Sequence, residues 1–555
     1  MNKTRRKKGM AWLLTVMLTA TLLAGCAGNN NNEGNAANKA SNGGNTDQSA
    51  DSQKTEGGGF PKSFSYWVEL DGDAAVSMTN FNENAAYKEL EKITGTKVEF
   101  KHPSTGSGQM QEQFNLMIAS RNLPDVIQTN WLTVPKGPQN AIDDGTIIKL
   151  NDLIETHAPN FKKYLEENPE VASMIKTDTG DIYAFPFIRG DDRIKVYYGP
   201  VVRKDWLDKV GATPPTTIEE WESVLTAFKD KDPNGNGKQD EIPFLLEVGS
   251  VRNDLLNSMI GAWGILAKFH KKGDKVQYGE MQPEFKKFLA TMNRWYENGL
   301  IDKDFAAVDG KLKDAKTSNN ELGLLYGYSS GTIGKFTDLM KDSVEGFQMM
   351  ALPHPTLNKG DVPAAGMISP TYPGEHSAAI TTAAKDPEQI VKWLDLAYGE
   401  QGHMLFNFGI EGTSYELVDG KPVYTDLIKN NPDKLTLKQA QAQFMRTQYG
   451  GPFVQDVESF LQQMKYPEQL QSLEVWSQAK NELQLPLMTL TADESSKLAS
   501  IMNDINTYSD EMVVKFIMGV EPLANFDQYV DNLKNFGIEE AISIQQAAYD
   551  RYLSR

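Results

Sequence analysis

Residues 231–244 read KDPNGNGKQDEIPF, and oxygen-bearing side chains recur there at alternate positions. They are Asp232, Asn234 and Asn236, followed by the carboxylates of Asp240 and Glu241. A chain that curls around a hard cation turns every second residue inward, and Gly235 and Gly237 permit the sharp turn. The stretch predicts an EF-hand-like calcium loop in which Lys238 contributes its backbone carbonyl.

The loop departs from the usual calcium pattern at its twelfth position, where Pro243 stands in place of an acidic residue. Asp240 and Glu241 then have to supply the closing carboxylates. A polar Asn-Gly turn that binds no ion is the alternative interpretation. Five oxygen ligands in phase favour calcium, because a simple turn does not require them.

The flanks of the loop indicate a structural ion site. Thr217 and Glu220 form a capping-box pattern, and apolar residues then recur at helical spacing up to Phe228. After the loop, Pro243 prevents an immediate helix, and residues 244–246 predict a short strand. Helix, loop and strand together favour an ion clip; a switch would require a large change of shape on calcium removal.

The N-terminus predicts export and lipid anchoring. Five basic residues precede an apolar run at 11–23 that is too short for a comfortable membrane span. The run ends in Leu-Ala-Gly-Cys at 23–26, which resembles the lipobox of bacterial lipoproteins, whose cysteine is diacylated. Cys26 is the only cysteine, so an internal disulfide and a thiolate metal cluster are excluded. An uncleaved signal anchor is the alternative to residues 1–25 as a lipoprotein signal peptide.

Composition separates a tether from the folded body. Residues 26–59 contain almost nothing that could be buried, so they predict a flexible tether. The remaining residues, about 500, are too many for one ordinary core, so two or more lobes are expected. Removal of the five basic residues before Cys26 takes the formal charge from −18 to −23, which argues against nucleic-acid binding.

Alternation of strand and helix patterns predicts an α/β layered lobe with parallel strands at the start of the body. The expected strands are 64–68, 97–100 and 124–127, and the expected helices are 82–94 and 109–120. Residues 181–198 predict a path from one lobe to the other. Later helices are expected at 285–298, from 387 through 396 and from Thr491 onward, and residues 512–518 and 526–536 are expected to continue a helical tail. Strands are expected at 322–326 and 378–380.

Several strings, in this order and spacing, resemble those of extracellular solute-binding lipoproteins of ABC importers, family 1, and especially the large type that includes the alginate-binding proteins. They are residues 123–127 (LPDVI), 205–209 (DWLDK), 232–243, 295–301 (WYENGLI), 409–412 (GIEG), 419–424 (DGKPVY) and 545–551 (QQAAYDR). The resemblance implies a two-lobed periplasmic-binding-protein type II fold of class α/β with an interlobe ligand cleft. It also implies a structural Ca²⁺ held by residues matching Asp232, Asn234, Asn236, Lys238, Asp240 and Glu241.

This resemblance, with the patterns above, gives a domain plan. The N-terminal lobe is expected at 60–190 and 368–450, and the C-terminal lobe with the calcium loop at 191–367. Residues 451–555 are expected to form a helical segment mainly of the C-terminal lobe. The chain is expected to be a monomer, anchored through Cys26 on the extracellular face of the cell membrane, that hands an oligosaccharide to the permease subunits of an ABC importer.

Sugar rings stack on aromatic planes and bind planar polar side chains, so the cleft candidates are mostly aromatic residues. They are Trp67, Trp131, Arg189, Trp263 and Tyr372. For each of them a core position is the alternative. The tryptophans on predicted helical faces are expected in the core: Trp206, Trp221, Trp295 and Trp393.

Other functions were weighed against binding. The six histidines are scattered, and no nucleophile elbow or phosphate-binding glycine loop is present, so no catalytic residue is predicted. Paired carboxylates of a glycosidase remain formally available among 74 acidic residues, but abundance is not evidence. A peptide-binding or sensory-partner lipoprotein of the same fold is the second candidate.

Overall fold

A computed structural model of the chain describes residues 59–106, 108–247, 255–446 and 450–554. The predicted signal peptide, Cys26 and all but the last residue of the predicted tether lie outside the described residues. None of the described helices is long and apolar enough to cross a membrane.

The first lobe is built on a four-stranded sheet in the order β11-β3-β1-β2. Its strands are β1 (Ser63–Trp67), β2 (Lys97–Lys101), β3 (Val126–Thr129) and β11 (Ser377–Ile380). β1 runs parallel to β2, with Ser63 opposite Lys97, and parallel to β3, with Tyr66 opposite Val126. The predicted parallel pairing is confirmed, and β11, from much later in the chain, closes the sheet antiparallel to β3.

Helices cover this sheet and bury its aromatic core. They are α1 (Ala85–Thr94), α2 (Gln109–Ser120), α3 (Gly137–Asp143), α4 (Asn151–His157), α5 (Pro159–Glu167), α6 (Pro169–Met174) and α13 (Pro387–Asp395). The helix expected from residue 82 begins at Ala85, because Asn84 accepts hydrogen bonds from the backbone N–H groups of Ala86 and Tyr87 and so caps it. The preceding Phe81–Glu83 forms a separate 3-10 turn.

The second lobe has its own four-stranded sheet, in the order β10-β5-β9-β6. Its strands are β5 (Tyr198–Arg203), β6 (Ile242–Phe244), β9 (Leu322–Tyr328) and β10 (Met349–Ala351). The strand expected at 244–246 instead begins at Ile242 and contains Pro243. β6 pairs with β9 on one side, and Phe244 forms a bridge with Ile301 on the other. The proline is tolerated because the N–H groups of Ile242 and Phe244, which flank it, donate to the carbonyls of Glu321 and Leu300.

Three tryptophans fill the core of this lobe, as expected from their helical faces: Trp206, Trp221 and Trp295 are fully buried. They are carried by α7 (Lys204–Val210), α8 (Ile218–Asp230) and α10 (Pro283–Glu297). The lobe also contains α11 (Gly310–Ser318), α12 (Lys335–Met340) and α18 (Pro467–Trp476), and α12 and α18 contribute to a separate core cluster. The strands β7 (Phe269–Lys272) and β8 (Lys275–Tyr278) form a hairpin in the same lobe. The capping box of Thr217 and Glu220 is present at the start of α8.

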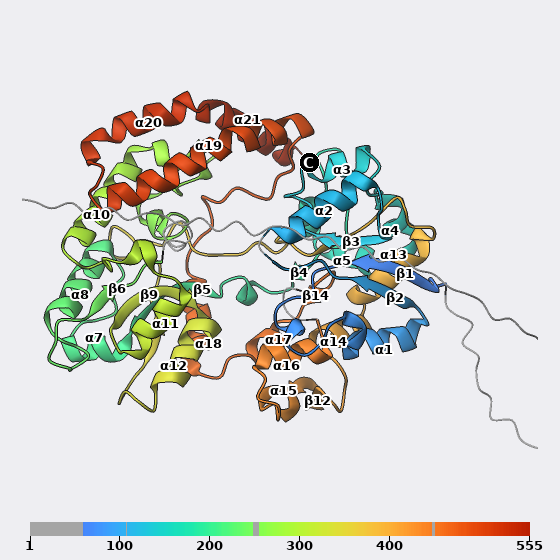
Figure 1. Cartoon of the computed structure of the whole chain (residues 1–555), viewed down its shortest axis with the longest axis horizontal. Coiled ribbons are helices and arrows are strands. Elements are labelled where there is room, and N and C mark those ends of the chain that lie inside the picture. Colours follow the sequence, from blue (N-terminus) through green and yellow to red (C-terminus); the bar gives the residue numbers. More distant parts are fainter. Residues whose placement is uncertain (1–58, 107, 248–254, 447–449, 555) are drawn as a thin grey trace, which may run out of the picture. The chain divides into compact units, whose positions relative to one another are not determined.

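The C-terminal arm consists of α19 (Ala492–Ile517), α20 (Phe526–Asn535) and α21 (Ile538–Leu553). α19 packs on α10, and α21 packs on α19, so these helices extend the second lobe (Figure 1). The capping box of Thr491 and Glu494 starts α19 as expected. Residues 512–517 continue α19, in keeping with the expected helical tail.

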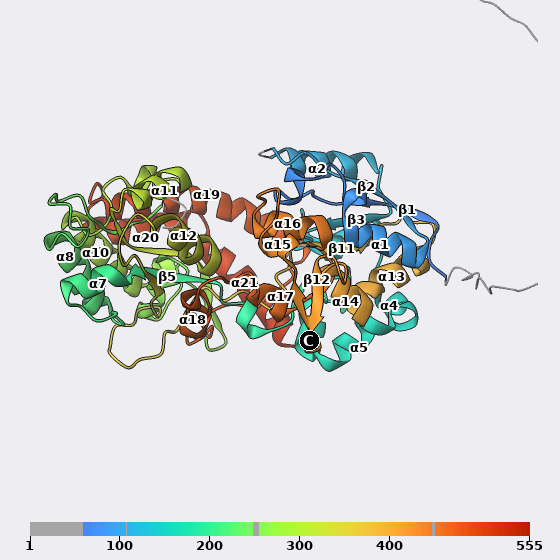
Figure 2. The same ribbon diagram turned by 90° about the horizontal axis from the view of Figure 1, so that it is seen from below.

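A third group of elements completes the first lobe and lies together in Figure 2. It comprises α14 (Glu400–Asn407), β12 (Tyr415–Val418), β13 (Lys421–Tyr424), α15 (Asp426–Lys429), α16 (Leu437–Phe444) and α17 (Val457–Leu461). Asp419 and Gly420 join β12 to β13 with positive φ angles of 51° and 79°, which suits a tight hairpin turn. Two lobes, each with its own sheet and core, confirm the predicted α/β fold class.

Candidate ligand-binding cleft

Three segments connect the lobes, and they meet around Arg189. The short strand β4 (Ile188–Arg189) pairs in parallel with β14 (Val454–Gln455), with Arg189 opposite Gln455. The N–H of Arg189 donates to the carbonyl of Thr371 at 2.8 Å, which joins the middle connection to the first. Backbone hydrogen bonds therefore fix the three connections to one another at this point.

A cavity of about 600 Å³ lies against these connections and the end of the second sheet. Its aromatic lining consists of Tyr197, Tyr198, Phe269, Tyr326 and Tyr328. The tyrosines gather here because β5 starts where β9 ends: Tyr198 lies opposite Tyr328 in the antiparallel register. Polar side chains complete the wall, among them Asn257, Ser369, Asn481 and Gln484.

The tyrosine rings form a platform within the cavity. Tyr197 and Tyr328 are stacked, with ring centroids 6.1 Å apart and planes 8° apart. Tyr198 meets Tyr328 edge to face at 4.6 Å. Tyr328 is 51% exposed although it is large and aromatic, so part of its surface is accessible to a ligand.

A second cavity of about 230 Å³ adjoins the first and shares Tyr197 and Tyr328 with it. Arg189, Lys438 and Gln455 line its other side. It is therefore bounded by the second lobe, by two connections and by α16 of the first lobe.

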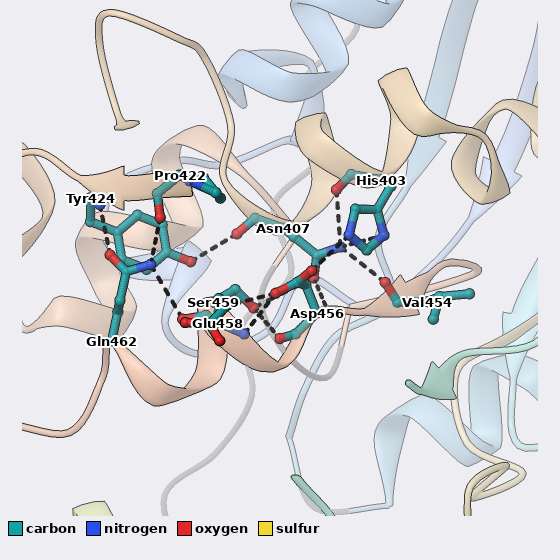
Figure 3. Close-up of polar contacts among 9 residues, drawn as sticks. All are labelled: His403, Asn407, Pro422, Tyr424, Val454, Asp456, Glu458, Ser459 and Gln462. Carbon is teal, nitrogen blue, oxygen red and sulfur yellow. Dashed lines mark hydrogen bonds and ion pairs between the residues drawn. The ribbon is translucent and has the colours of Figure 1, made fainter. Parts of the chain in front are cut away.

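The position of Gln455 is set by a buried amide (Figure 3). Asn407, at the end of α14, donates through Nδ2 to the carbonyl of Val454 at 2.9 Å and accepts through Oδ1 from the N–H of Asp456 at 2.8 Å. One side chain thus holds the backbone on both sides of Gln455. The carbonyl of Asn407 in turn accepts from the Tyr424 hydroxyl at 2.8 Å.

A histidine–carboxylate pair supports the same strand. His403 Nε2 lies 2.9 Å from Asp456 Oδ2, and Asp456 Oδ1 caps α17 by accepting from the N–H of Glu458 at 2.6 Å. Burial raises the pKa of the Asp456 carboxyl, but the contact with His403 and the cap outweigh it, so the pKa lies below its usual value. The pair anchors the third connection and does not line either cavity.

Of the five ligand-binding candidates from the sequence, only Arg189 lines the cavities described here. Trp131 is fully buried and donates to the carbonyl of Ser377 at 3.1 Å, and the hydroxyl of Tyr372 bonds to that of Tyr183 at 2.7 Å. Trp67 packs on Phe114 in the first lobe, and Trp263 packs on Phe288 in the second.

The tyrosines of the platform are not among the ligand-binding residues that the sequence predicts. Tyr197 and Tyr198 were placed on the predicted crossover, and adjacent tyrosines at a crossover were the available signal. Tyr326 and Tyr328 carried no such signal, because strand periodicity does not reveal which strand end faces a cleft.

The predicted calcium loop connects α8 to β6, as expected from its flanks. Asp232 accepts hydrogen bonds from the N–H groups of Gly235, Asn236 and Gly237, so its carboxylate lies at the centre of the turn. The Asp240 carboxylate accepts from the side-chain amides of Asn234 and Asn236, and these bonds lower its pKa.

Glu241 is the exception in this loop. Both of its carboxylate oxygens are buried and have no hydrogen-bond partner among the described residues. Burial raises the pKa of Glu241, and the nearby charges of Asp232 and Asp240 raise it further. In the ranges that the structure describes, no group of three or more His, Cys, Asp and Glu side chains is close enough to hold a metal ion as it stands.

Two α/β lobes joined by three connections, with an aromatic and polar cavity against those connections, define a binding protein of the type II periplasmic class. The family model for bacterial extracellular solute-binding proteins matches residues 75–404, which is more than half of the chain. The chain belongs to this family.

Named relatives agree with this class. The fructooligosaccharide ABC transporter substrate-binding protein FusA of Streptococcus pneumoniae is 26% identical over 568 residues, which cover 97% of each protein. A solved structure of a FusA EF-hand mutant with fructo-nystose superposes with a TM-score of 0.69 at 25% identity, over 89% of this chain and 100% of that one. The alginate-binding protein AlgQ2, solved without calcium ion, gives 0.68 at 24% identity, over 88% of this chain and 98% of that one, and supports the fold alone.

Proposed function

We propose that this protein captures an oligosaccharide between its lobes and delivers it to an ABC importer. The observation that carries the proposal is the stack of Tyr197 and Tyr328 at the wall shared by both cavities. A sugar ring offers C–H groups to such a face and hydroxyls to neighbouring amides and hydroxyls. The adjoining cavities, of about 600 and 230 Å³, leave room for more than one ring.

The family and the relatives support the same substrate class. FusA, which matches nearly the whole chain, is by its name a fructooligosaccharide-binding component of an ABC transporter. Closure of the lobes on the ligand would then present one bound form to the permease, because ligand shifts the balance between open and closed forms. Catalysis is not part of the proposal.

The calcium loop is proposed to hold one structural Ca²⁺ through Asp232, Asn234, Asn236, Lys238, Asp240 and Glu241. The donor set fits a hard cation, since it consists of oxygens, and a cation would neutralise the buried, unpartnered carboxylate of Glu241 beside Asp232 and Asp240. Binding requires the amides of Asn234 and Asn236 to present oxygen where they now present nitrogen to Asp240. The ion would fix the connection between α8 and β6 at a distance from both cavities.

We further propose that Cys26 carries the lipid anchor and that the protein works as a monomer on the extracellular face of the cell membrane. The lipobox-like string carries this proposal. Mass spectrometry of the natural N-terminus tests it: a diacylated cysteine at the first position supports it, and an uncleaved leader contradicts it.

The function is tested by thermal-shift and calorimetric titration of the full chain with panels of oligosaccharides and of peptides. Saturable binding of a saccharide that is recovered unchanged by chromatography supports the proposal. Binding of peptides alone would favour the peptide-binding alternative, and a cleaved saccharide would contradict a purely binding role.

A further inference from the structure

The smaller cavity is cationic although the protein as a whole is acidic. Among the described residues its lining includes Arg189 and Lys438 and contains no aspartate or glutamate. The charge of Asp73 acts on Lys438, so Arg189 is the cation on which the argument depends. The larger cavity differs, because its charged wall residues, Glu247 and Lys313, form an ion pair at 2.6 Å and neutralise each other. On a chain of formal charge −18, a local cationic pocket calls for a specific reason.

Arg189 is a buried cation without a carboxylate partner among the described residues. It is only 5% exposed, and its Nε has no hydrogen-bond partner in that part of the chain. Its one side-chain hydrogen bond is a long one, 3.5 Å from Nη2 to the hydroxyl of Tyr197. The rings of Phe187 and Tyr197 lie 5.6 and 5.4 Å from the guanidinium carbon, so its faces are covered while its N–H edge is not paired.

Arg203 is a buried arginine whose guanidinium is paired within the chain. It is 1% exposed, and its Nε and Nη2 donate to the two oxygens of Asp205 at 2.8 and 2.6 Å. Its Nη1 donates to Asn320 at 2.7 Å. A guanidinium stays charged at any physiological pH, so its burial requires an anion or a full set of acceptors. Arg203 has an anion and a further acceptor within the chain, whereas Arg189 has no anion and one long hydrogen bond among the described residues.

An acceptor lies directly across from Arg189. Gln455 is 3% exposed, lines the same cavity, and its Oε1 has no hydrogen-bond partner among the described residues. The pairing of β4 with β14 sets these two side chains opposite each other. A group that carries both an anionic oxygen and a hydroxyl would satisfy both atoms.

We propose that this cavity is a subsite for an anionic sugar, in which Arg189 binds the carboxylate of a uronate residue while Gln455 accepts from a neighbouring hydroxyl and the Tyr197–Tyr328 stack supports the ring. The inference rests on the proposed function and narrows it to acidic oligosaccharides. A guanidinium edge matches a carboxylate in a two-bond fork, whereas a neutral sugar offers no charge to offset the desolvation of the arginine. A sulfate ester presents the same chemistry, and the test separates the two.

The test uses the full-length chain and trisaccharides of galacturonate, glucuronate, mannuronate and guluronate, each as the free acid and as the methyl ester. Esterification removes the charge and keeps the sugar. Neutral and sulfated trisaccharides complete the set. At least one free acid is expected to bind about tenfold or more tightly than its ester, and its affinity is expected to fall with added NaCl while that of the ester does not. A preference for sulfated over uronate sugars supports the anionic subsite and assigns the anion to a sulfate ester.

Variants assign the preference to the residue. Arg189→Gln is expected to abolish the preference for the acid while affinity for the ester stays within about twofold, and Arg189→Lys is expected to retain part of it. Arg193→Gln, four positions along the chain at an exposed arginine paired with Asp191, is the matched control and is expected to keep the full preference. If the Arg189 variants do not fold, the salt dependence of binding to the unaltered protein still tests whether the subsite is anion-binding.

Failure of the inference differs from failure of the proposed function. Binding of neutral or esterified sugars as tightly as their acids, with no salt dependence, overturns the anionic subsite and leaves the oligosaccharide function standing. An equal loss for acid and ester in Arg189→Gln also overturns it. Binding of no saccharide in the whole panel overturns the proposed function and this inference together.

Discussion

Arg551, near the C-terminus, contacts Asp178 of the first lobe, 373 positions earlier in the chain. The same guanidinium binds Glu494 at the start of α19 through both carboxylate oxygens, at 2.9 and 2.6 Å. Asp178 also accepts from the hydroxyl of Thr489 at 2.8 Å. The C-terminal arm of the second lobe is thereby tied to the first lobe by polar bonds that do not involve the three chain connections.

Asp178→Ala is expected to weaken this contact between the lobes and shift the ligand-free protein toward a more open form. The groups are partly exposed, so the contribution is about 1 kcal/mol or less, which corresponds to about fivefold or less in the lobe equilibrium. Small-angle scattering and distance measurements between labels on the two lobes follow the change. Glu494→Gln removes a bond within one lobe and serves as the control; an equal shift in both variants would contradict this role for Asp178.

Tyr328→Ala is expected to weaken the best saccharide ligand about tenfold, or ~1.4 kcal/mol, because the stacked ring is lost. The melting temperature should stay nearly unchanged, since the side chain is 51% exposed. Calorimetric titration and thermal unfolding measure the two quantities. Leu357→Ala, at an exposed residue outside both cavities, is the comparison, and unchanged affinity in Tyr328→Ala would show that the platform does not bind the sugar.

Trp263→Ala is expected to act on stability rather than on binding. The indole is 9% exposed and packs edge to face on Phe288 at 5.3 Å, so its removal should lower the free energy of unfolding by about 3–5 kcal/mol. Denaturant unfolding gives this value, and titration of the folded fraction should give unchanged affinity. A loss of affinity without a loss of stability would instead show that Trp263 binds the ligand, as the sequence predicts.

The capping box of α8 predicts a pH dependence. Hydrogen bonds from the backbone and hydroxyl of Thr216, and a bond to Lys359, lower the pKa of Glu220 from 4.5 to about 2. A lowered carboxyl pKa stabilises the fold fully above pH 4.5, and this stabilisation is lost as the pH falls toward 2. Glu220→Gln should therefore have a lower melting temperature than the unaltered protein at pH 7, and the gap should narrow between pH 4.5 and 2. A gap that is constant over this range would contradict the assignment.

Calcium is expected to raise the melting temperature of the full chain relative to the chelated protein. At a calcium concentration 100 times Kd the gain is about 2.7 kcal/mol in the free energy of unfolding. Asp240→Asn should remove most of this gain, while Asp230→Asn, in the neighbouring helix, should keep it. Scattering curves with and without chelator should agree, because the ion is proposed to clip the loop; a gross change of shape would indicate a switch.

The local order of the sequence determined much of the fold. β-prone residues at 64–68 and alternation at 97–100 predicted strands, and capping boxes at Thr217 and Thr491 predicted helix starts, because these signals depend on neighbours within a few positions. Helical periodicity also placed Trp206, Trp221 and Trp295 in the core. The predicted bounds of β6 differ from those observed, since the tolerance for Pro243 depends on which backbone N–H groups the assembled sheet uses.

Only the tertiary structure decided the site. An aromatic residue at or just after the end of a strand has the same local pattern whether it faces a core or a cleft, so the sequence alone does not separate Trp131, which is buried, from Tyr328, which is 51% exposed. Arg189 indicates a ligand site only in the folded protein. There β14, more than 260 positions later in the chain, places Gln455 opposite it, and no carboxylate among the described residues pairs with it. Pairing between distant segments decides which buried groups are satisfied within the chain, and the groups left without partners mark the cavity where a ligand is expected.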